Sequence, residues 1–379
     1  MIGSVEPRAD DGYSAGRVTS TLMTTGALDG DAPLFAVIGE ALIDLVDPGN
    51  GTACAAHPGG SPLNVAIGLA RLGQPVAFLG RFSRDPFGTV LRNHADRSGV
   101  DLTFAIAGDE PSTVALLDIK GGIARYEFSV DATVDFQWTD SELEHLPPSV
   151  GWVHFGSLAS WRPPGDAVIT RRIAALRSAG DVVISYDPNV RPQLQPDAAG
   201  ARGQVEQAVR HAHVVKASTE DLQWLYPGEP VADVARRWLQ TGSELVVVTR
   251  GEAGAVAFPA DGAALERPVF PAPAIDTVGA GDAFTSGLLD ALGRRGILSV
   301  ARLADLHQPG TLADVLDDAA LVAALTCTRP GADPPRRSEV EAELRAEAER
   351  ARPKVTPEDE PRPAAQRRPA GQRPRRPAR

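Results

Sequence analysis

Apolar and polar positions follow two patterns along this chain of 379 residues. Apolar runs of four or five residues are typical of buried strands, and apolar residues three or four positions apart are typical of helices. The runs predict strands at 35–38, 41–46, 76–80, 152–155, 182–186, 213–216 and 245–249. The helical spacing predicts helices at 63–72, 87–97, 166–179, 200–211, 219–226, 231–241 and 283–292.

From about residue 152 onward the predicted strands and helices alternate. Such alternation is typical of a parallel sheet with helices on both faces, so the pattern predicts a three-layer α/β/α domain. Ligands of open parallel sheets bind at the carboxyl ends of the strands. Residues just after each strand are therefore the first candidates for a site.

An early part of the chain has a different character. Residues 113–119 and 124–128 alternate around a Lys120-Gly121-Gly122 turn, as an antiparallel ribbon would, and Asn50-Gly51 is a hairpin-turn signal. We expect these segments, from about 42–57 and 102–132, to form a small β-sheet lid on the main domain.

The ends of the chain differ from the middle. Residues 1–32 show no sustained apolar period, and 352–379 hold nine basic and three acidic residues among prolines and alanines. Segments with so little apolar surface are expected to be disordered. We expect a leader at 1–32, one domain at 33–350 and a Pro/Arg-rich tail at 351–379.

Composition narrows the class of protein. The net charge of -11 argues against a nucleic-acid binder, although the basic tail leaves RNA binding open as an alternative. Two cysteines far apart, Cys54 and Cys327, fit a reducing cytosol, so a cytoplasmic location is predicted. No apolar stretch approaches the roughly 18 residues of a membrane helix.

Common phosphate-binding motifs are absent from the sequence. None of the three lysines follows a glycine, which excludes a P-loop of the G-x-x-x-x-G-K type. No G-x-G-x-x-G opens a helix after a strand with an acidic residue about 20 positions on, and the histidines show no metal-ligand spacing.

A different anion site is visible at 276–284. Gly279 and Gly281 let the backbone turn its amides inward just before an apolar helical run begins at Ala283. A helix N-terminus with free amides is an anion site. Asp282 lies in its first turn, where an isolated aspartate would be a mere cap or a charge on the helix dipole. The glycines on one side and Asp276-Thr277 on the other argue against that reading.

Two long segments carry a family resemblance. Residues 276–282 and 58–73 resemble the C-terminal and N-terminal signatures of ribokinase-like (PfkB) carbohydrate kinases. Within the family, residues 59–73 and 85–88 look most like fructokinases. Smaller matches lie in the expected order, at Gly39-Glu40 with Asp44, 85–88, 187–191, and 249–251 with Gly254. The resemblance covers about 34–345 and implies a ribokinase-like fold.

The resemblance implies a reaction and a set of residues. Asp282 would take the proton from a sugar hydroxyl, while the amides of Gly279, Ala280 and Gly281 would hold the charge on the γ-phosphoryl group of Mg-ATP. The implied sugar-binding residues are Asp44, Gly59, Gly60, Asn64, Asn189, Arg191 and Asp282. The implied ATP-binding residues are Lys216, Ser218, Asp221, Thr249, Arg250, Gly251, Gly254, Gly279 and Gly281.

Metal binding is implied at two places. Asp221 would help to organise magnesium through water, although Ser218 and Asp221 stand where the family often has asparagine and glutamate. Asp276 and Thr277 lie where some relatives bind a monovalent cation, so potassium activation is expected.

The acceptor sugar is the open question. Fructose is the first choice, 2-keto-3-deoxygluconate is the second because Arg191 or Arg84 could pair with its carboxylate, and ribose or a nucleoside follows. A non-catalytic sugar or nucleotide sensor on a kinase fold is the alternative from another class. The expected partners are a small sugar and ATP, with a homodimer through the lid, no nucleic acid and no membrane.

Overall fold

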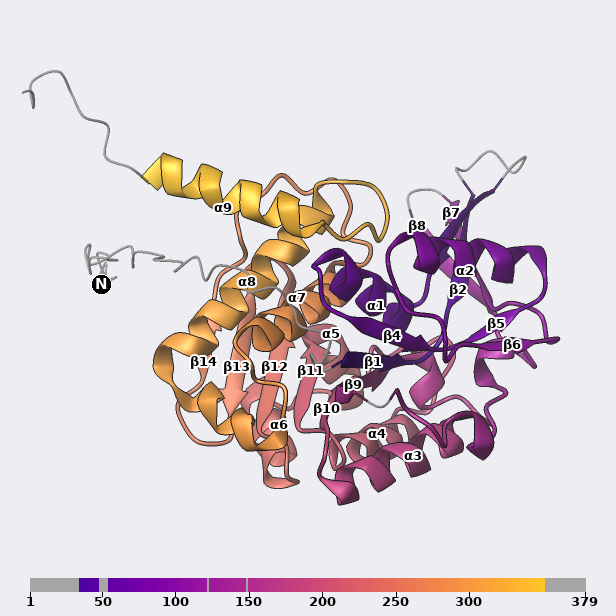
Figure 1. Ribbon diagram of the computed structural model, residues 1–379, viewed down its shortest axis with the longest axis horizontal. Coiled ribbons are helices and arrows are strands. Elements are labelled where there is room, and N and C mark those ends of the chain that lie inside the picture. The colour runs from indigo at the N-terminus through magenta and orange to yellow at the C-terminus, as the bar shows by residue number, and fades with distance from the viewer. Residues whose placement is uncertain (1–33, 48–53, 121–122, 148, 352–379) are drawn as a thin grey trace, which may run out of the picture. The chain divides into compact units, whose positions relative to one another are not determined.

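The computed structural model describes residues 34–47, 54–120, 123–147 and 149–351. Its central sheet has eight strands in the order β14-β13-β12-β11-β10-β9-β1-β4 (Figure 1). The strands from β4 to β12 are parallel, and β13 and β14 are antiparallel additions at one edge. Their bounds are β1 Leu34–Ile38, β4 Val76–Leu79, β9 Val150–Gly156, β10 Val183–Asp187, β11 Val214–Ser218, β12 Leu245–Thr249, β13 Ala255–Pro259 and β14 Leu265–Arg267.

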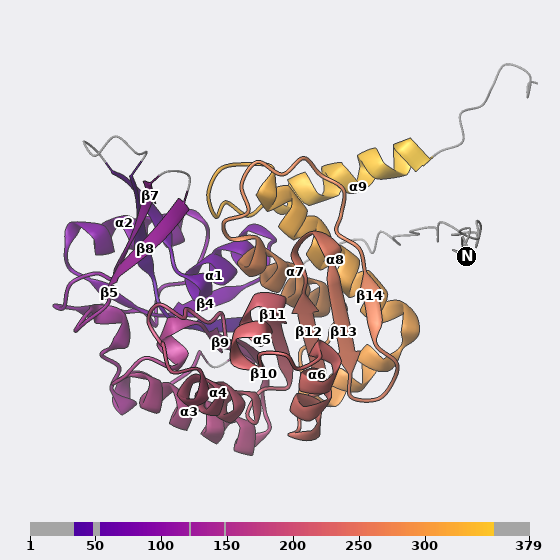
Figure 2. The ribbon, with the colours of Figure 1, turned by 180° about the vertical axis from the view of Figure 1, so that it is seen from behind.

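Helices cover both faces of this sheet (Figures 1 and 2). One face packs against α1 (Ser61–Arg71), α2 (Pro86–Arg97), α7 (Ala280–Arg294) and α8 (Pro309–Cys327). The other packs against α3 (Asp166–Ala179), α4 (Ala198–Val209), α5 (Thr219–Leu225) and α6 (Val231–Gln240). Successive strand residues point to opposite faces, so Val37 belongs to the first core and Ile38 to the second. The predicted α/β/α layers are thus confirmed.

The described residues form six further helices, five of them 3-10 helices. They are the 3-10 helices η1 (Val134–Phe136), η2 (Asp140–Glu142), η3 (Leu158–Ser160), η4 (Gly251–Ala253) and η5 (Val300–His307), and the helix α9 (Arg337–Ala351). Within the described ranges, no helix is both long and apolar enough to cross a membrane.

A second, four-stranded sheet lies beside α2 (Figure 1). Its order is β3-β2-β7-β8, with β2 Leu42–Asp47, β3 Ala55–Gly59, β7 Val114–Lys120 and β8 Ile123–Ser129. We call these four strands the small sheet. It confirms the predicted lid, but residues 106–108 of the 102–132 range form β6 (Ile106–Gly108) and pair with β5 (Arg81–Ser83) instead. The Asn50-Gly51 turn lies outside the described residues.

Asp85 joins α2 to the small sheet. Its Oδ1 accepts the Gly88 amide at 2.7 Å as the N-cap of α2, and also accepts the Ser112 hydroxyl at 2.7 Å. Its Oδ2 accepts the Ser112 amide at 2.8 Å, two residues before β7. One carboxylate therefore fixes both a helix start and the entry to a strand of the small sheet.

Asp85→Ala is expected to destabilise the fold by about 2–3 kcal/mol, because it removes a helix cap and leaves the Ser112 amide without an acceptor. The matched control is Asp197→Ala at the start of α4, where the side chain caps only the Ala199 amide and the expected cost is about 1 kcal/mol. Urea unfolding measures both. Equal losses in the two variants would show that the Ser112 bonds contribute nothing.

Candidate active site

The start of α7 lies at the edge of the sheet where the parallel strands end. Gly279 has φ 75°, and a Cβ placed there would lie 2.5 Å from Cβ of Ala332, so this position needs glycine. The Ala280 amide donates to the Thr277 carbonyl at 3.2 Å, and the Ala283 amide to the Gly279 carbonyl at 2.8 Å. The Ala280 amide, predicted to face the phosphoryl group, therefore already has an acceptor in its own loop. The amides of Gly281 and Asp282 find no carbonyl acceptor among the described residues, which makes this turn suitable for an anion.

Asp282 occupies this first turn and contacts the start of α1. Its Oδ1 accepts a hydrogen bond from the Ser61 hydroxyl at 2.7 Å, and its Oδ2 accepts one from Nδ2 of the Asn64 side chain at 2.8 Å. The structure thus joins the predicted base to the predicted sugar-binding asparagine, although they lie 218 positions apart. Burial raises the pKa of Asp282, while the hydrogen bonds from Asn64 and Ser61 oppose that rise.

Asp44 belongs to the same site. It lies on β2 beside β3, and a Cβ at Gly59 would lie only 2.3 Å from its Oδ2, so glycine makes room for this carboxylate. Burial raises the pKa of Asp44 to about 6 against the opposing charge of Arg191, and the charge of Asp282 raises it further. Gly60 has φ 103°, which lets the chain turn from the small sheet into α1.

Asn189 and Arg191 follow the end of β10. Asn189 has φ 38°, and Arg191 donates from Nη1 to the Asn189 carbonyl at 3.3 Å, the Val190 carbonyl at 3.1 Å and the Asn189 side chain. These bonds hold the guanidinium over its own loop, where its charge reaches Asp44. Arg84, in contrast, is an exposed residue paired with Asp109.

A buried ion pair lies beneath the glycine turn. Lys216 on β11 donates from Nζ to Oδ2 of Asp187 at 2.9 Å, and both side chains are almost fully buried. A Cβ at Gly281 would lie 3.1 Å from this Nζ, so the ammonium sits against the first turn of α7. Although burial disfavours the ammonium, the charge of Asp187 raises the pKa of Lys216.

Three residues of the site, Asp187, Ser61 and Glu40, were not predicted, although all three lie inside the segments that carry the family resemblance. Asp187 is the last residue of β10 and Ser61 the first of α1. Position at a strand end was the usable signal for Asp187, since that edge collects polar groups in parallel sheets.

Ser218 and Asp221 interact closely at the start of α5. Oδ2 of Asp221 accepts the Ser218 amide at 2.9 Å and hydroxyl at 2.8 Å, and Oδ1 accepts the Val190 amide at 2.8 Å. Asp221 therefore links α5 to the loop that carries Arg191. A hollow of about 260 Å³ follows this loop, and its lining includes Asn189, Arg191, Ser218, Asp221 and Trp224.

The predicted ATP-side residues after β12 shape a tight turn. Gly251 has φ 54° and Gly254 has φ 81°, and a Cβ at Gly254 would lie 2.1 Å from the Arg267 carbonyl oxygen. Arg250 donates to the Ala253 carbonyl at 3.2 Å and to Glu266 at 3.1 Å, which places its side chain along β14. Thr249 ends β12, where its hydroxyl lies 3.4 Å from the Ala217 carbonyl.

Asp276 and Thr277 precede the glycine turn. The Asp276 carboxylate accepts the Val278 amide at 3.0 Å and the Gly331 amide at 2.8 Å, so it shapes its own loop and ties that loop to the segment after α8. The Thr277 carbonyl accepts the Ala280 amide. Their predicted role in cation binding stays a prediction.

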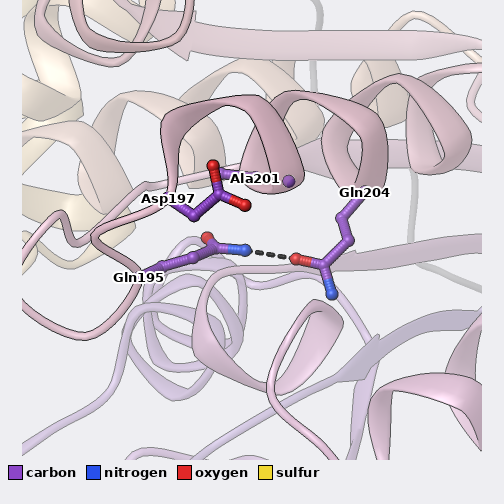
Figure 3. Close-up of a pocket in the computed structure, with 5 residues that line it drawn as sticks. Gln195, Asp197, Ala201 and Gln204 are labelled. Carbon is purple, nitrogen blue, oxygen red and sulfur yellow. Dashed lines mark hydrogen bonds between the residues drawn. The ribbon is translucent and has the colours of Figure 1, made fainter.

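A second hollow lies at the start of α4, where Gln195 donates to Gln204 (Figure 3). Its lining residues are Gln195, Asp197, Gly200, Ala201 and Gln204. None of them belongs to the predicted site.

A carboxylate beside backbone amides that can hold an anion is an arrangement that suits phosphoryl transfer to a hydroxyl group. Comparison with known families narrows this class. Residues 32–339 match the family described as "pfkB family carbohydrate kinase". The chain belongs to that family and is a carbohydrate kinase.

Curated relatives and solved structures agree with this assignment. A fructokinase of Klebsiella pneumoniae is 34% identical over 304 residues, which cover 78% of this chain and 94% of the relative. The structure of a fructokinase with bound ATP from Xylella fastidiosa has a TM-score of 0.77 at 27% identity, covering 83% of this chain and 99% of that one.

A second enzyme is also similar in structure. An aminoimidazole riboside kinase from Salmonella enterica, complexed with aminoimidazole riboside and an ATP analog, has a TM-score of 0.68 at 26% identity. The match covers 82% of this chain and 99% of that one. The fold is therefore shared by kinases of different acceptors.

Lys216→Met is expected to destabilise the protein by about 3–5 kcal/mol, because it leaves the buried Asp187 carboxylate without its cation. Lys216→Met with Asp187→Leu is expected to cost less than the single change, since it removes both charges. Urea unfolding of Lys216→Met, Asp187→Leu and the double variant measures the coupling free energy between the two side chains. Strict additivity of the two changes would rule out a direct interaction.

Proposed function

We propose that this kinase transfers the γ-phosphoryl group of Mg-ATP to a primary hydroxyl of fructose, with Asp282 as the general base. The observation that carries the proposal is the position of the Asp282 carboxylate, between the open amides of α7 and the polar start of α1. A base within reach of both an acceptor hydroxyl and an anion site is what such a transfer requires.

The residues present fit Mg-ATP. A cradle made of glycine backbone at Gly279 and Gly281, with the Lys216 ammonium against it, suits a phosphate chain. Ile275 and Val278, in the same loop, are exposed apolar side chains that could cover part of a base. Bound Mg-ATP would supply the phosphoryl group; this chain would hold it by backbone amides, with Asp221 near the metal through water, and with the turn from Thr249 to Gly254 on the nucleotide side.

On the sugar side, the ionised Asp44 would accept two hydroxyl hydrogen bonds. Asn64 and Arg191 would donate to other sugar oxygens, and the backbone at Gly59 and Gly60 would let the ring approach closely. The proton of the attacking hydroxyl would pass to Asp282, whose hydrogen bonds from Ser61 and Asn64 hold its oxygens in place.

Fructose is favoured by the names of the relatives. Besides the two fructokinases above, a fructokinase double mutant from Vibrio cholerae O395 in a fructose, ADP and potassium ion bound form has a TM-score of 0.71 at 28% identity, covering 82% of this chain and 97% of that one. A riboside is the second candidate, favoured by the aminoimidazole riboside kinase. For 2-keto-3-deoxygluconate, Arg191 could meet the carboxylate, since Arg84 is paired with Asp109.

Asp282→Asn is expected to lower kcat for fructose by about 100- to 10,000-fold, because the amide cannot take the hydroxyl proton. The measurement is ADP release from Mg-ATP with fructose, 2-keto-3-deoxygluconate, ribose, glucose and adenosine as separate acceptors. Asn keeps one oxygen for Ser61, so the fold should survive.

The panel separates the alternatives. If the protein prefers another acceptor and Asp282→Asn abolishes that activity, the proposed role of Asp282 stands and the other acceptor replaces fructose as the substrate. Turnover that survives in Asp282→Asn would show that Asp282 is not the base. ATP binding with no turnover on any acceptor would favour a sensor.

The dependence of kcat/KM for fructose on pH follows from the two raised carboxyl pKa values. Asp44 and Asp282 act in their ionised forms, so kcat/KM should be full above about pH 7 and fall as the pH drops through about 6, the pKa of Asp44. Initial rates between pH 4.5 and 8.5 at low fructose measure this. A profile that stays flat down to pH 5 contradicts the assignment.

A further inference from the structure

Within the described ranges, the chain passes four times between the central sheet, called the large sheet below, and the small sheet, and the four crossings meet. The first runs through Glu40-Ala41 into β2, and the second returns through Gly60 into α1. A Cβ at Gly60 would lie 2.7 Å from the Glu40 carbonyl oxygen, so these two crossings touch. The Ile43 amide, at the start of β2, donates to the Thr113 carbonyl at 3.0 Å, which joins the strand that the first crossing enters to the third crossing, just before β7.

Asp135, on η1, lies where these crossings meet. Its Oδ1 accepts the Ala41 amide at 2.8 Å, and the Thr113 side chain also hydrogen-bonds to its carboxyl group. The Thr113 hydroxyl lies 2.6 Å from that of Thr133, which donates to the Val130 carbonyl at 3.1 Å, just after β8. One fully buried side chain is thus linked to the first, third and fourth crossings.

Glu40 fixes the same crossings to the large sheet. Its Oε2 accepts the Ala159 amide at 3.0 Å, and Ser157 hydrogen-bonds to its side chain. Both partners lie just beyond β9. Two buried carboxyl groups thus act at neighbouring residues. Asp135 holds the Ala41 amide, and Glu40, the residue before Ala41, is bound to the segment just beyond β9.

Burial of the Asp135 carboxyl group costs free energy. Burial raises its pKa to about 7 against the Ala41 hydrogen bond, and the charge of Glu40 adds to the rise. Its Oδ2 is buried with no hydrogen-bond partner among the described residues. An apolar side chain would avoid the cost of an unpaired oxygen, so the hydrogen bonds to Ala41 and Thr113 have to account for a carboxyl here.

We propose that Asp135 is a positioning residue that clamps the crossings and so holds the small sheet where Asp44 can meet the sugar. Ala41 lies three residues before Asp44 on the same entry into β2, so a shift at Ala41 is passed directly to that carboxylate. The idea rests on the proposed function for the role of Asp44, and it extends the site to a residue that touches neither substrate nor nucleotide.

The test compares Asp135→Leu with Asp135→Asn. Asp135→Leu removes the acceptor of the Ala41 amide, whereas Asp135→Asn keeps a carbonyl oxygen for it. The matched control is His213→Leu, which removes the buried acceptor of the Ile184 amide at 3.0 Å, just before β11 and therefore at the opposite end of the strands from the site. The readouts are KM for fructose, KM for ATP and amide hydrogen exchange.

In Asp135→Leu, KM for fructose is expected to rise about tenfold or more while KM for ATP stays within about twofold. Amides of β2 and β7 should exchange faster, and those of β10 should not. Asp135→Asn should stay within about threefold of the parent for fructose, and His213→Leu should not separate the two KM values.

Equal changes in both KM values, or exchange in β2 and β7 that matches the parent, would overturn the clamp. So would Asp135→Asn behaving like Asp135→Leu. If Asp135→Leu does not fold, Thr113→Val takes its place and must show the same selective rise for fructose. Should the parent fail to phosphorylate fructose, the proposed function falls, while the exchange of β2 and β7 still decides the clamp.

Discussion

Asp282 holds two helix starts together, and the rest of the site is arranged around that contact. Its oxygens accept from Ser61 and Asn64, so the positive ends of α1 and α7 face one carboxylate. Each helix can begin there because a glycine with positive φ, Gly60 or Gly279, turns the chain into it. Burial makes the ionised carboxylate costly, and the hydrogen bonds offset part of that cost. The balance leaves a carboxylate that is fixed in place and readily protonated, as a general base should be.

The surrounding charges extend this arrangement in two directions. Below the glycine turn, the Lys216–Asp187 pair places a buried cation against the backbone that would face phosphate. On the other side, Asp44 reaches the site from the small sheet, and its raised pKa reflects the same burial. The site is therefore built from both sheets, and the crossings at Glu40 and Asp135 decide how the two sheets meet.

Much of the fold could be predicted because its signals are local. Every predicted strand and helix of the α/β/α body is present within a few residues, since apolar period and glycine positions report directly on burial and turns. The antiparallel strands β13 and β14 and the long helix α8 were not predicted. For β13, the run Ala255–Pro259 lies so close to β12 that pattern alone does not separate a hairpin from a loop. The helix α8 is apolar on more than one side, which blurs the helical period.

The features of the site likewise fall into two groups, those that local sequence marks and those that depend on long-range contacts. Asp282, Gly279 and Asn64 stand in segments whose residue order carries the information, so the sequence sufficed to select them. The pairing of Lys216 with Asp187, the double use of Asp221 and the position of Asp135 depend on contacts between distant segments. A lone aspartate such as Asp135, in the stretch after β8, has no local feature that marks it as fully buried.

The most direct test of the account is to identify the product. Mg-ATP and fructose labelled with carbon-13 at its primary carbons would be incubated with the protein and followed by phosphorus and carbon NMR. The account predicts one new phosphomonoester signal that grows in step with ADP, together with coupling of phosphorus to a primary carbon. ADP formed together with inorganic phosphate, or a phosphate on a secondary carbon, would contradict it.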